Sequence, residues 1–262
     1  MNTIKSQIIS RLQQEILVLE GFKVGSAGGS DLGLGPINNA FPGNTFPIGA
    51  VHEFLSSCQE TGAATCGFIA ALLGQLMKSE GVAVWISRKR DIFPPALRAL
   101  GIQPDKIIFL DLLKEKHVMW AVEEALKCGA LSAVVGELTE ISFAASRRLQ
   151  LAVEQSKVTG FIVRNSPRQL SATACVSRWK VTPLLSHTVD SLPGVGFPRW
   201  NIELQRIRNG TPGVWRVHWA SGNFVIEKNN TTAIPPVGET YPSRDRTENE
   251  RAASMIRLQK AV

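Results

Sequence analysis

Residues 49–77 have the frame of a phosphate-binding loop but not its chemistry. A short β-forming run leads into a polar turn ended by a glycine, and an apolar helix-forming stretch follows. A working loop, G-x-x-x-x-G-K-[ST], needs a Lys for the β- and γ-phosphates and a hydroxyl for Mg²⁺. The four specified positions hold Ser57, Gly62, Ala63 and Ala64. The pattern therefore predicts a degenerate nucleotide loop with no ATPase activity and no cofactor.

The composition is that of a chain with one main core. The 262 residues are 44% hydrophobic, and no stretch approaches about twenty uninterrupted apolar residues, which predicts no membrane span. The basic, amphipathic N-terminus lacks the apolar core of a signal peptide. The cysteines and histidines, which show no metal-ligand spacing, are Cys58, Cys66, Cys128, Cys175, His52, His117, His187 and His218. We expect a cytoplasmic protein with free thiols and no bound metal.

The charge is unevenly distributed. The formal net charge is +7, and residues 142–186 hold seven basic residues against the single acid Glu154. An excess of this kind favours acidic partners, such as nucleic acid or an acidic protein surface. Basic residues scattered over the surface for solubility would give the same count, so both interpretations stay open at this point.

The N-terminal part reads as a helical arm on a tether. Apolar residues recur at helical spacing, which predicts an amphipathic helix over residues 1–23. Its candidate partner-binding residues are Ile8, Leu12 and Ile16. Residues 24–48 are rich in Gly, Asn, Ser and Pro and are predicted to be a flexible or extended linker. The helix either packs on its own domain or docks on a neighbouring protein.

Residues 49–185 alternate in the manner of an α/β domain with a mostly parallel sheet flanked by helices. Strands are expected at residues 82–86, 106–110, 132–137, 159–163 and 172–181, and helices at 117–128 and 142–155. Residues 186–228 then change to alternating strands around an Asn209-Gly210 turn, which predicts an antiparallel β-hairpin extension. Residues 229–262 are predicted to be a flexible basic tail with a helix in it.

Many short motifs follow one another in the order of a known family. They are GAVHE at 49–53, AVWI at 83–86, LRALGI at 97–102, WAVEEAL at 120–126, VVGEL at 134–138, SRRLQLA at 146–152, SRW at 177–179, PRW at 198–200 and LQRIRNG at 204–210 with Trp215. Over residues 49–227 the chain resembles the ImuA family of SOS mutagenesis proteins, and its core resembles a RecA-type ATPase.

The resemblance implies an adaptor role in bacterial translesion synthesis. Its partners would be an ImuB-type inactive Y-family polymerase and an error-prone C-family polymerase. DNA and RecA are further candidate partners, and a small homo-oligomer is an open alternative to a monomer. Two rival functions remain: a SulA-type inhibitor that binds the tubulin-like division protein, and an active recombinase-like ATPase, against which the loop residues argue.

The resemblance to RecA also shows where catalytic parts are missing. The Walker-B acid position holds Glu137, while residues 87–90, where a recombinase carries its catalytic Glu, read Ser-Arg-Lys-Arg. A cation cannot activate the attacking water. We therefore expect no enzymatic activity.

The segments that correspond to DNA-binding loops are short, at residues 138–143 and 164–172. The candidate DNA contacts are Arg164, Arg168, Arg178 and Lys180. Such residues would hold phosphates without reading the base sequence. Arg147 and Arg148 belong to the helix predicted at residues 142–155. Instead of contacting DNA, these two residues would pair with Glu137 and Glu140 and hold the core together.

Overall fold

The computed structural model describes residues 32–79, 81–187 and 196–227, which belong to one structural unit. The expected N-terminal helix with Ile8, Leu12 and Ile16, and the expected tail at residues 229–262, lie outside the described residues. Within those ranges the α/β class is confirmed: a mostly parallel sheet carries helices and continues into C-terminal antiparallel strands.

One nine-stranded sheet organises the described part of the chain, in the order β3-β2-β4-β5-β1-β6-β7-β8-β9. The strands are β1 (Val51–Ser56), β2 (Ala83–Ser87), β3 (Ile107–Asp111), β4 (Ala133–Leu138), β5 (Thr159–Asn165), β6 (Ser177–His187), β7 (Phe197–Ile207), β8 (Gly213–Ala220) and β9 (Asn223–Ile226). In this spatial order, neighbouring strands from β3 through β1 to β6 pair in parallel, and neighbouring strands from β6 to β9 pair antiparallel. The central strands are buried on both sides because helices or loops cover both faces.

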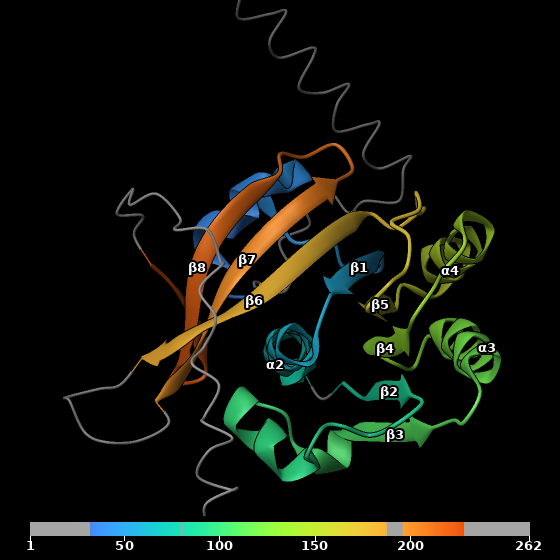
Figure 1. Cartoon of the computed structure of the whole chain (residues 1–262), viewed down its shortest axis with the longest axis horizontal. Coiled ribbons are helices and arrows are strands. Elements are labelled where there is room, and N and C mark those ends of the chain that lie inside the picture. Colours follow the sequence, from blue (N-terminus) through green and yellow to red (C-terminus); the bar gives the residue numbers. More distant parts are fainter. Residues whose placement is uncertain (1–31, 80, 188–195, 228–262) are drawn as a thin grey trace, which may run out of the picture. The chain divides into compact units, whose positions relative to one another are not determined.

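Helices cover the two faces of the parallel strands (Figure 1). α2 (Gln59–Leu76) lies on one face, and the sheet curls around it as the antiparallel strands begin. α3 (Glu115–Leu126) and α4 (Phe143–Ser156) lie together on the other face. Ser142 caps α4 by accepting a hydrogen bond from Ala145 N at 3.1 Å. Short 3₁₀ segments, η3 (Met77–Ser79), η4 (Pro94–Leu100) and η5 (Pro104–Lys106), complete the connections.

Residues 32–48, which the sequence predicts to be a flexible or extended linker, instead form part of the core. Two 3₁₀ segments, η1 (Gly35–Ala40) and η2 (Pro42–Asn44), occupy this stretch. The apolar side chains buried in the core here are Leu32, Leu34, Ile37, Ala40, Phe41 and Phe46. The Gly, Asn and Pro content fits these tight turns as well as it fits a linker, which is why composition alone pointed elsewhere.

The predicted antiparallel hairpin is confirmed as β7 and β8, but it is part of a larger extension. β6 joins the parallel strands to it, and β9 adds a further strand at the far edge. β6 begins at Ser177, five residues later than the sequence predicts, because residues 166–176 form a loop held by arginine side chains.

Candidate functional site

The connection between β1 and α2 is too short to be a phosphate-binding loop. Only Ser57 and Cys58 separate the strand from the helix, so Gly62 lies within the helix rather than at the end of a loop. The Thr61 hydroxyl accepts hydrogen bonds from the backbone N–H groups of Ser57 and Cys58, both at 3.1 Å. These two amides are therefore satisfied by the protein's own side chain and are not free to bind a phosphate.

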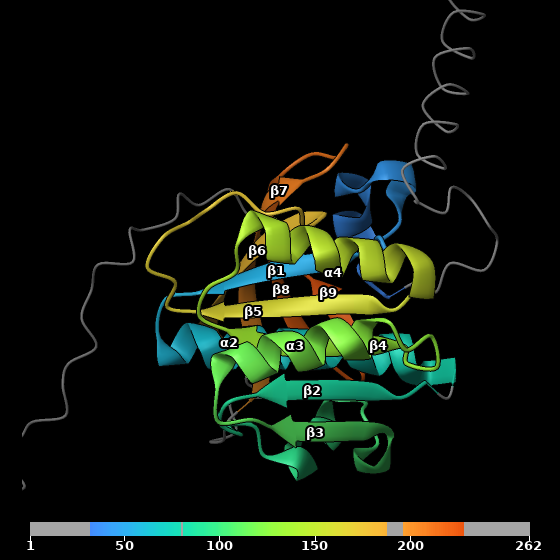
Figure 2. The same ribbon diagram turned by 90° about the vertical axis from the view of Figure 1, so that its right-hand side faces the viewer.

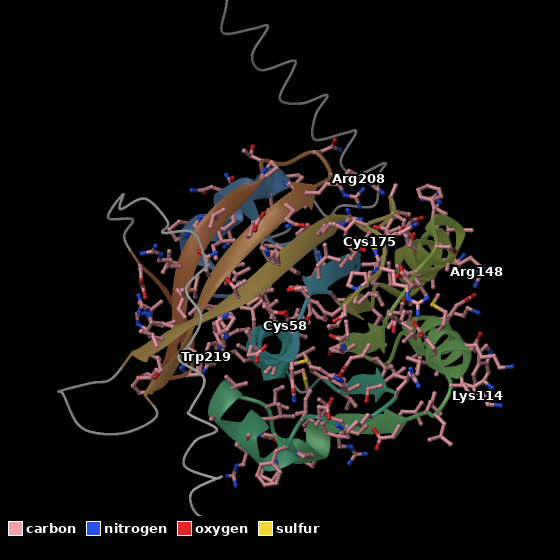
Figure 3. All side chains as sticks on the ribbon, viewed as in Figure 1. Cys58, Lys114, Arg148, Cys175, Arg208 and Trp219 are labelled. Atoms are coloured by element: carbon pink, nitrogen blue, oxygen red, sulfur yellow. The ribbon has the colours of Figure 1, made fainter. Side chains whose placement is uncertain are left out.

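The two alanines of the degenerate pattern both lie within α2 and differ in their exposure to solvent. Ala63 is exposed and Ala64 is 8% exposed, so only the first could present a longer side chain to solvent. Thr65, the next hydroxyl along the chain, is fully buried. Figure 3 shows the neighbouring Cys58 at the start of α2. The sequence predicts a polar turn that ends at Gly62. This prediction is wrong, because α2 already starts at Gln59.

Glu137, at the Walker-B position on β4, is engaged by two hydrogen-bond donors. Trp85 Nε1 donates to one carboxylate oxygen at 2.7 Å, and Asn165 Nδ2 donates to the other at 3.1 Å. Burial raises the pKa of the Glu137 carboxyl above its usual range, while these two bonds act to lower it. Both donors come from strands beside β4, so the carboxylate links strand ends.

The basic residues after β2 contact neighbouring surface groups of the protein. Arg88 donates to Leu113 O at 3.4 Å, and Arg90 pairs with Asp111 at 2.6 Å. Lys89 pairs with Asp91 at 2.7 Å on the surface. No carboxylate stands at the position where a recombinase would carry its catalytic Glu, since the chain has Ser-Arg-Lys-Arg there.

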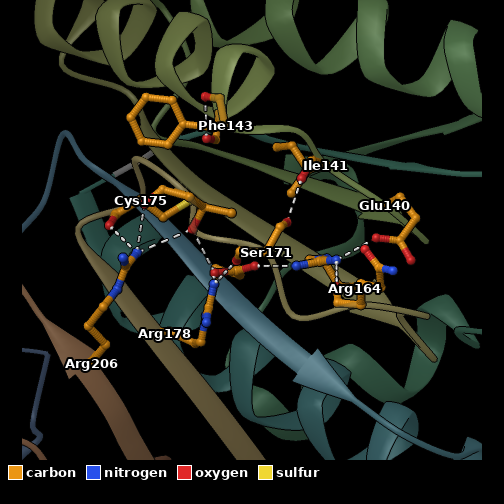
Figure 4. A network of polar contacts seen from close by, with 12 residues as sticks. Glu140, Ile141, Phe143, Arg164, Ser171, Cys175, Arg178 and Arg206 are labelled. Atoms are coloured by element: carbon orange, nitrogen blue, oxygen red, sulfur yellow. Dashed lines mark hydrogen bonds and ion pairs between the residues drawn. The ribbon is translucent and has the colours of Figure 1, made fainter.

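Arg164 lies in the interior and not on a DNA-binding surface (Figure 4). It is fully buried, and its guanidinium donates to Glu53 at 2.9 Å, to Glu140 at 2.6 Å and to Gln169 O at 2.9 Å. Glu53 is likewise fully buried on β1. A charge withdrawn from water in this way must be paired and hydrogen-bonded, as it is here. The structure therefore corrects the prediction that Arg164 contacts DNA.

Further arginines hold the loop at residues 166–176 by its carbonyl groups. Arg178, which is opposite Glu53 in the sheet register, donates to Glu53 and to Ser171 O, both at 2.7 Å. Arg206 donates to Thr173 O at 2.9 Å and to Cys175 O at 3.0 Å, as Figure 4 shows. The candidate DNA residue Arg178 is thus occupied by the protein itself, with its side chain 14% exposed.

Sequence reasoning missed this cluster, although one signal for it was present. Glu53 is an acid in the middle of a strand whose residues are all buried, and such a residue needs a cation beside it. The cations that pair with Glu53 come from β5 and β6, far along the chain, so only the sheet topology identifies them.

The remaining basic candidates have different surroundings. Arg168 is exposed, and only its backbone N–H is held, donating to Glu140 at 2.6 Å. Lys180 is half-buried on β6, opposite Glu203. The partners expected for Arg147 and Arg148 are wrong: Arg147 lies 3.9 Å from Glu154 and Arg148 3.1 Å from Glu123. Figure 3 shows Arg148 on the surface of α4.

Two searches of the described residues concern other classes of site. No group of three or more His, Cys, Asp or Glu side chains in these ranges is arranged to hold a metal ion. Among the helices of the same ranges, none is both long enough and apolar enough to cross a membrane.

Comparison with known proteins gives relatives of two kinds. No protein-family model matches the chain. Over 191 residues it is 34% identical to Protein ImuA of Caulobacter vibrioides strains NA1000 / CB15N and ATCC 19089 / CIP 103742 / CB 15, an alignment that covers 68% of this chain and 78% of the relative. It is 29% identical over 114 residues to Cell division inhibitor SulA of Serratia marcescens, covering 44% of this chain and 67% of that protein.

Proposed function

The chain belongs to the ImuA family, and from this premise we propose that it is a non-catalytic accessory protein of SOS mutagenesis. In this proposal it bridges an ImuB-type inactive Y-family polymerase and an error-prone C-family polymerase during translesion synthesis. The RecA-type origin of the core belongs to the same proposal, as does a cytoplasmic location.

The observation that carries the non-catalytic assignment is the closed connection between β1 and α2. The Thr61 hydroxyl occupies the backbone amides of Ser57 and Cys58, and no Lys follows Gly62. A charge-assisted hydrogen bond contributes about 1.5–3 kcal/mol, so losing the Lys and the free amides together removes most of the affinity for a triphosphate. An accessory protein that binds other proteins needs none of these groups.

Reconstitution from purified components tests the bridging role. The C-family polymerase of the same bacterium is immobilised, and retention of its ImuB-type protein is measured by surface plasmon resonance with and without this chain. We expect retention to rise when the chain is present and to be the same with Mg·ATP, Mg·ADP or no nucleotide. Equal retention without the chain, or retention that requires ATP, would contradict the proposal.

Weak, sequence-independent DNA binding is a finer part of the proposal, and we assign it to the basic residues that are not engaged inside the fold. With Arg164 and Arg178 engaged internally, Arg168 and Lys180 are the members of the predicted set left to contact phosphates. Anisotropy of a labelled single strand should show affinity that falls steeply with salt and is reduced in the Arg168→Ala/Lys180→Ala variant. Arg98→Ala, at an exposed position on η4, is the matched control.

A SulA-type inhibitor is the second candidate, favoured by the match over 114 residues. Overexpression of the chain should then produce filamentous cells, and the purified chain should slow assembly of the tubulin-like division protein. Normal cell length on overexpression, with unchanged assembly, would remove this candidate while leaving the accessory role intact.

A further inference from the structure

The loops that follow four neighbouring strands form one hydrogen-bonded surface. We call it the strand-end platform: Arg88 after β2, residues 112–115 after β3, residues 139–143 after β4 and residues 166–171 after β5. Figure 2 shows the arrowheads of β2, β3 and β5 pointing to the same edge, where these loops lie. In open α/β sheets this carboxyl edge is where ligands bind.

Hydrogen bonds join these loops in sequence across the edge. Glu115 accepts from the backbone N–H groups of Thr139 and Glu140, at 2.6 and 3.1 Å, which links the loops after β3 and β4. Ser171 donates to Ile141 O at 3.3 Å, which links the loops after β4 and β5. With the contacts of Arg88 and Arg168 described above, the platform is tied together before any partner arrives, so little ordering cost remains for binding.

Large apolar side chains project from the platform into solvent. Leu113 in the connection after β3 is 88% exposed, Leu170 in the loop after β5 is 64% exposed, and Phe143, the first residue of α4, is 59% exposed. Apolar groups gathered on a preorganised surface are typical of protein-binding sites. β3 and β5 are three strand spacings apart, about 14 Å, a distance that a short peptide segment can span.

The charges of the strand-end platform indicate which kind of partner fits it. Its acids are already engaged, Glu115 by backbone amides and Glu140 by Arg164, and the adjoining Asp111 at the end of β3 pairs with Arg90. By contrast, none of the described acidic side chains pairs with Arg88, Lys114 or Arg168, all of which are exposed. The surface therefore presents apolar groups beside uncompensated positive charge.

We propose that the strand-end platform docks an acidic protein segment that carries apolar anchor residues. The inference rests on the proposed accessory function, which requires a partner-binding surface, and it assigns that surface to the edge where a nucleotide site would otherwise lie. Acidic side chains of the segment meet Arg88, Lys114 and Arg168, and its apolar side chains cover Leu113, Phe143 and Leu170.

Fluorescence anisotropy with labelled sixteen-residue peptides tests this docking site on the full chain. The probe has Leu or Phe at every fourth position with Asp, Glu and Ser between them. A second peptide replaces the acids by Lys, and a third replaces the apolar residues by Ser. We expect only the acidic apolar peptide to bind, with affinity falling at higher salt because the charge pairs are exposed.

Variants at exposed positions locate the binding without unfolding the protein. Leu113→Ser/Leu170→Ser and Arg168→Glu should each weaken binding of the acidic apolar peptide at least about tenfold. Their matched controls, Leu185→Ser at a 79% exposed position on β6 and Arg98→Glu on η4, should leave it unchanged. Equal binding of all three peptides, or equal loss in platform and control variants, would overturn the assignment. If the bridging assay succeeds with these platform variants, the accessory function stands and the docking site is refuted.

Discussion

At the scale of single residues, the buried pair of Arg164 and Glu53 shows why the basic segment is not a simple DNA-binding surface. Both side chains are fully buried, and their terminal polar atoms are met by Glu140, Gln169 O, Arg178 and the Thr173 hydroxyl, while Arg164 Nε is buried without a hydrogen-bond partner among the described residues. Desolvating two charges is costly, so the pair stabilises the fold only because each partner compensates the other. Removing one of them leaves the other uncompensated.

Arg164→Ala should therefore lower the free energy of unfolding by about 3–5 kcal/mol, since it strands Glu53 in the interior with Arg178 as its one remaining cation. Urea unfolding followed by tryptophan fluorescence measures the change. The exposed Arg168→Ala provides the control and should stay within about 0.5 kcal/mol of wild type. Equal stability of the two variants would show that the buried network contributes little.

His52 is a second buried polar residue with a defined protonation state. Its Nε2 lies 2.7 Å from Pro47 O and must donate, while Nδ1 lies 2.6 Å from the Ser177 hydroxyl. Burial lowers the pKa of the His52 imidazole from 6.5 to about 4, although the bond to Pro47 acts to raise it. The neutral ring thus fastens the segment before β1 to the sheet.

The depressed pKa of His52 predicts a loss of stability in acid. Between pH 6.5 and 4 the unfolded chain binds a proton at His52 that the folded chain does not, so the free energy of unfolding falls as the pH falls. The contribution amounts to about 3 kcal/mol by pH 4. Urea unfolding of wild type and His52→Gln at several pH values isolates it, because other titrating groups are shared. The same pH dependence in both proteins would refute the assignment.

At the scale of elements, the start of α2 decides whether the nucleotide loop can be repaired. The two-residue connection after β1 leaves no loop to wrap a phosphate, and Thr61 holds its amides. Changing the two alanines supplies the missing side chains but not the missing backbone. We therefore expect the geometry of the element, and not only its residue types, to disfavour nucleotide binding.

The variant Ala63→Lys/Ala64→Ser restores the Lys and the hydroxyl of the pattern and should still bind no Mg·ATP. Ala63 is exposed, so the Lys should be tolerated, and the variant should melt within a few degrees of wild type. Isothermal titration calorimetry provides the readout. Micromolar binding by this variant would mean that residue identity alone, and not the helix start, disables the loop.

The elements that sequence analysis located well are those defined by local pattern. The apolar runs that became β2, β4 and β5, and the amphipathic stretch that became α3, carry their periodicity within a few residues. The start of α2 was missed because Gly62 is compatible with a loop end and a helix alike. The core segment η1 was missed because its burial depends on contacts with strands distant in sequence.

The candidate site was less predictable than the fold for the same reason. The loss of the Lys at Ala63 is visible in the sequence, since it follows from one position. The engagement of Arg164 by Glu53 depends on β1 and β5 being neighbours in the sheet, 111 residues apart in the chain. Charge counting along residues 142–186 could not distinguish a buried cation from an exposed one.

At the scale of the whole molecule, the predicted N-terminal arm remains a proposal about assembly. A chain without nucleotide at its joints has lost the chemistry that supports recombinase-type filaments, so we expect a monomer or a small closed oligomer. Ile8→Asp/Leu12→Asp should change the mass, the melting temperature or the affinity for the ImuB-type protein, because burying a carboxylate costs several kcal/mol. Light scattering measures the mass, thermal melts measure the melting temperature, and a binding assay measures the affinity. If none of these three quantities changes in the variant, a role for the arm is contradicted.

The central claim, that the chain supports SOS mutagenesis without nucleotide chemistry, is tested most directly by damage-induced mutation frequency in its own bacterium. A deletion strain is complemented with the wild-type gene or with Glu137→Gln, at equal protein levels checked by immunoblot. We predict that deletion lowers the mutation frequency after ultraviolet irradiation and that both genes restore it, because the proposal gives Glu137 no role beyond accepting hydrogen bonds from Trp85 and Asn165. An unchanged frequency on deletion, or failure of a stably folded Glu137→Gln protein to restore it, would contradict the account.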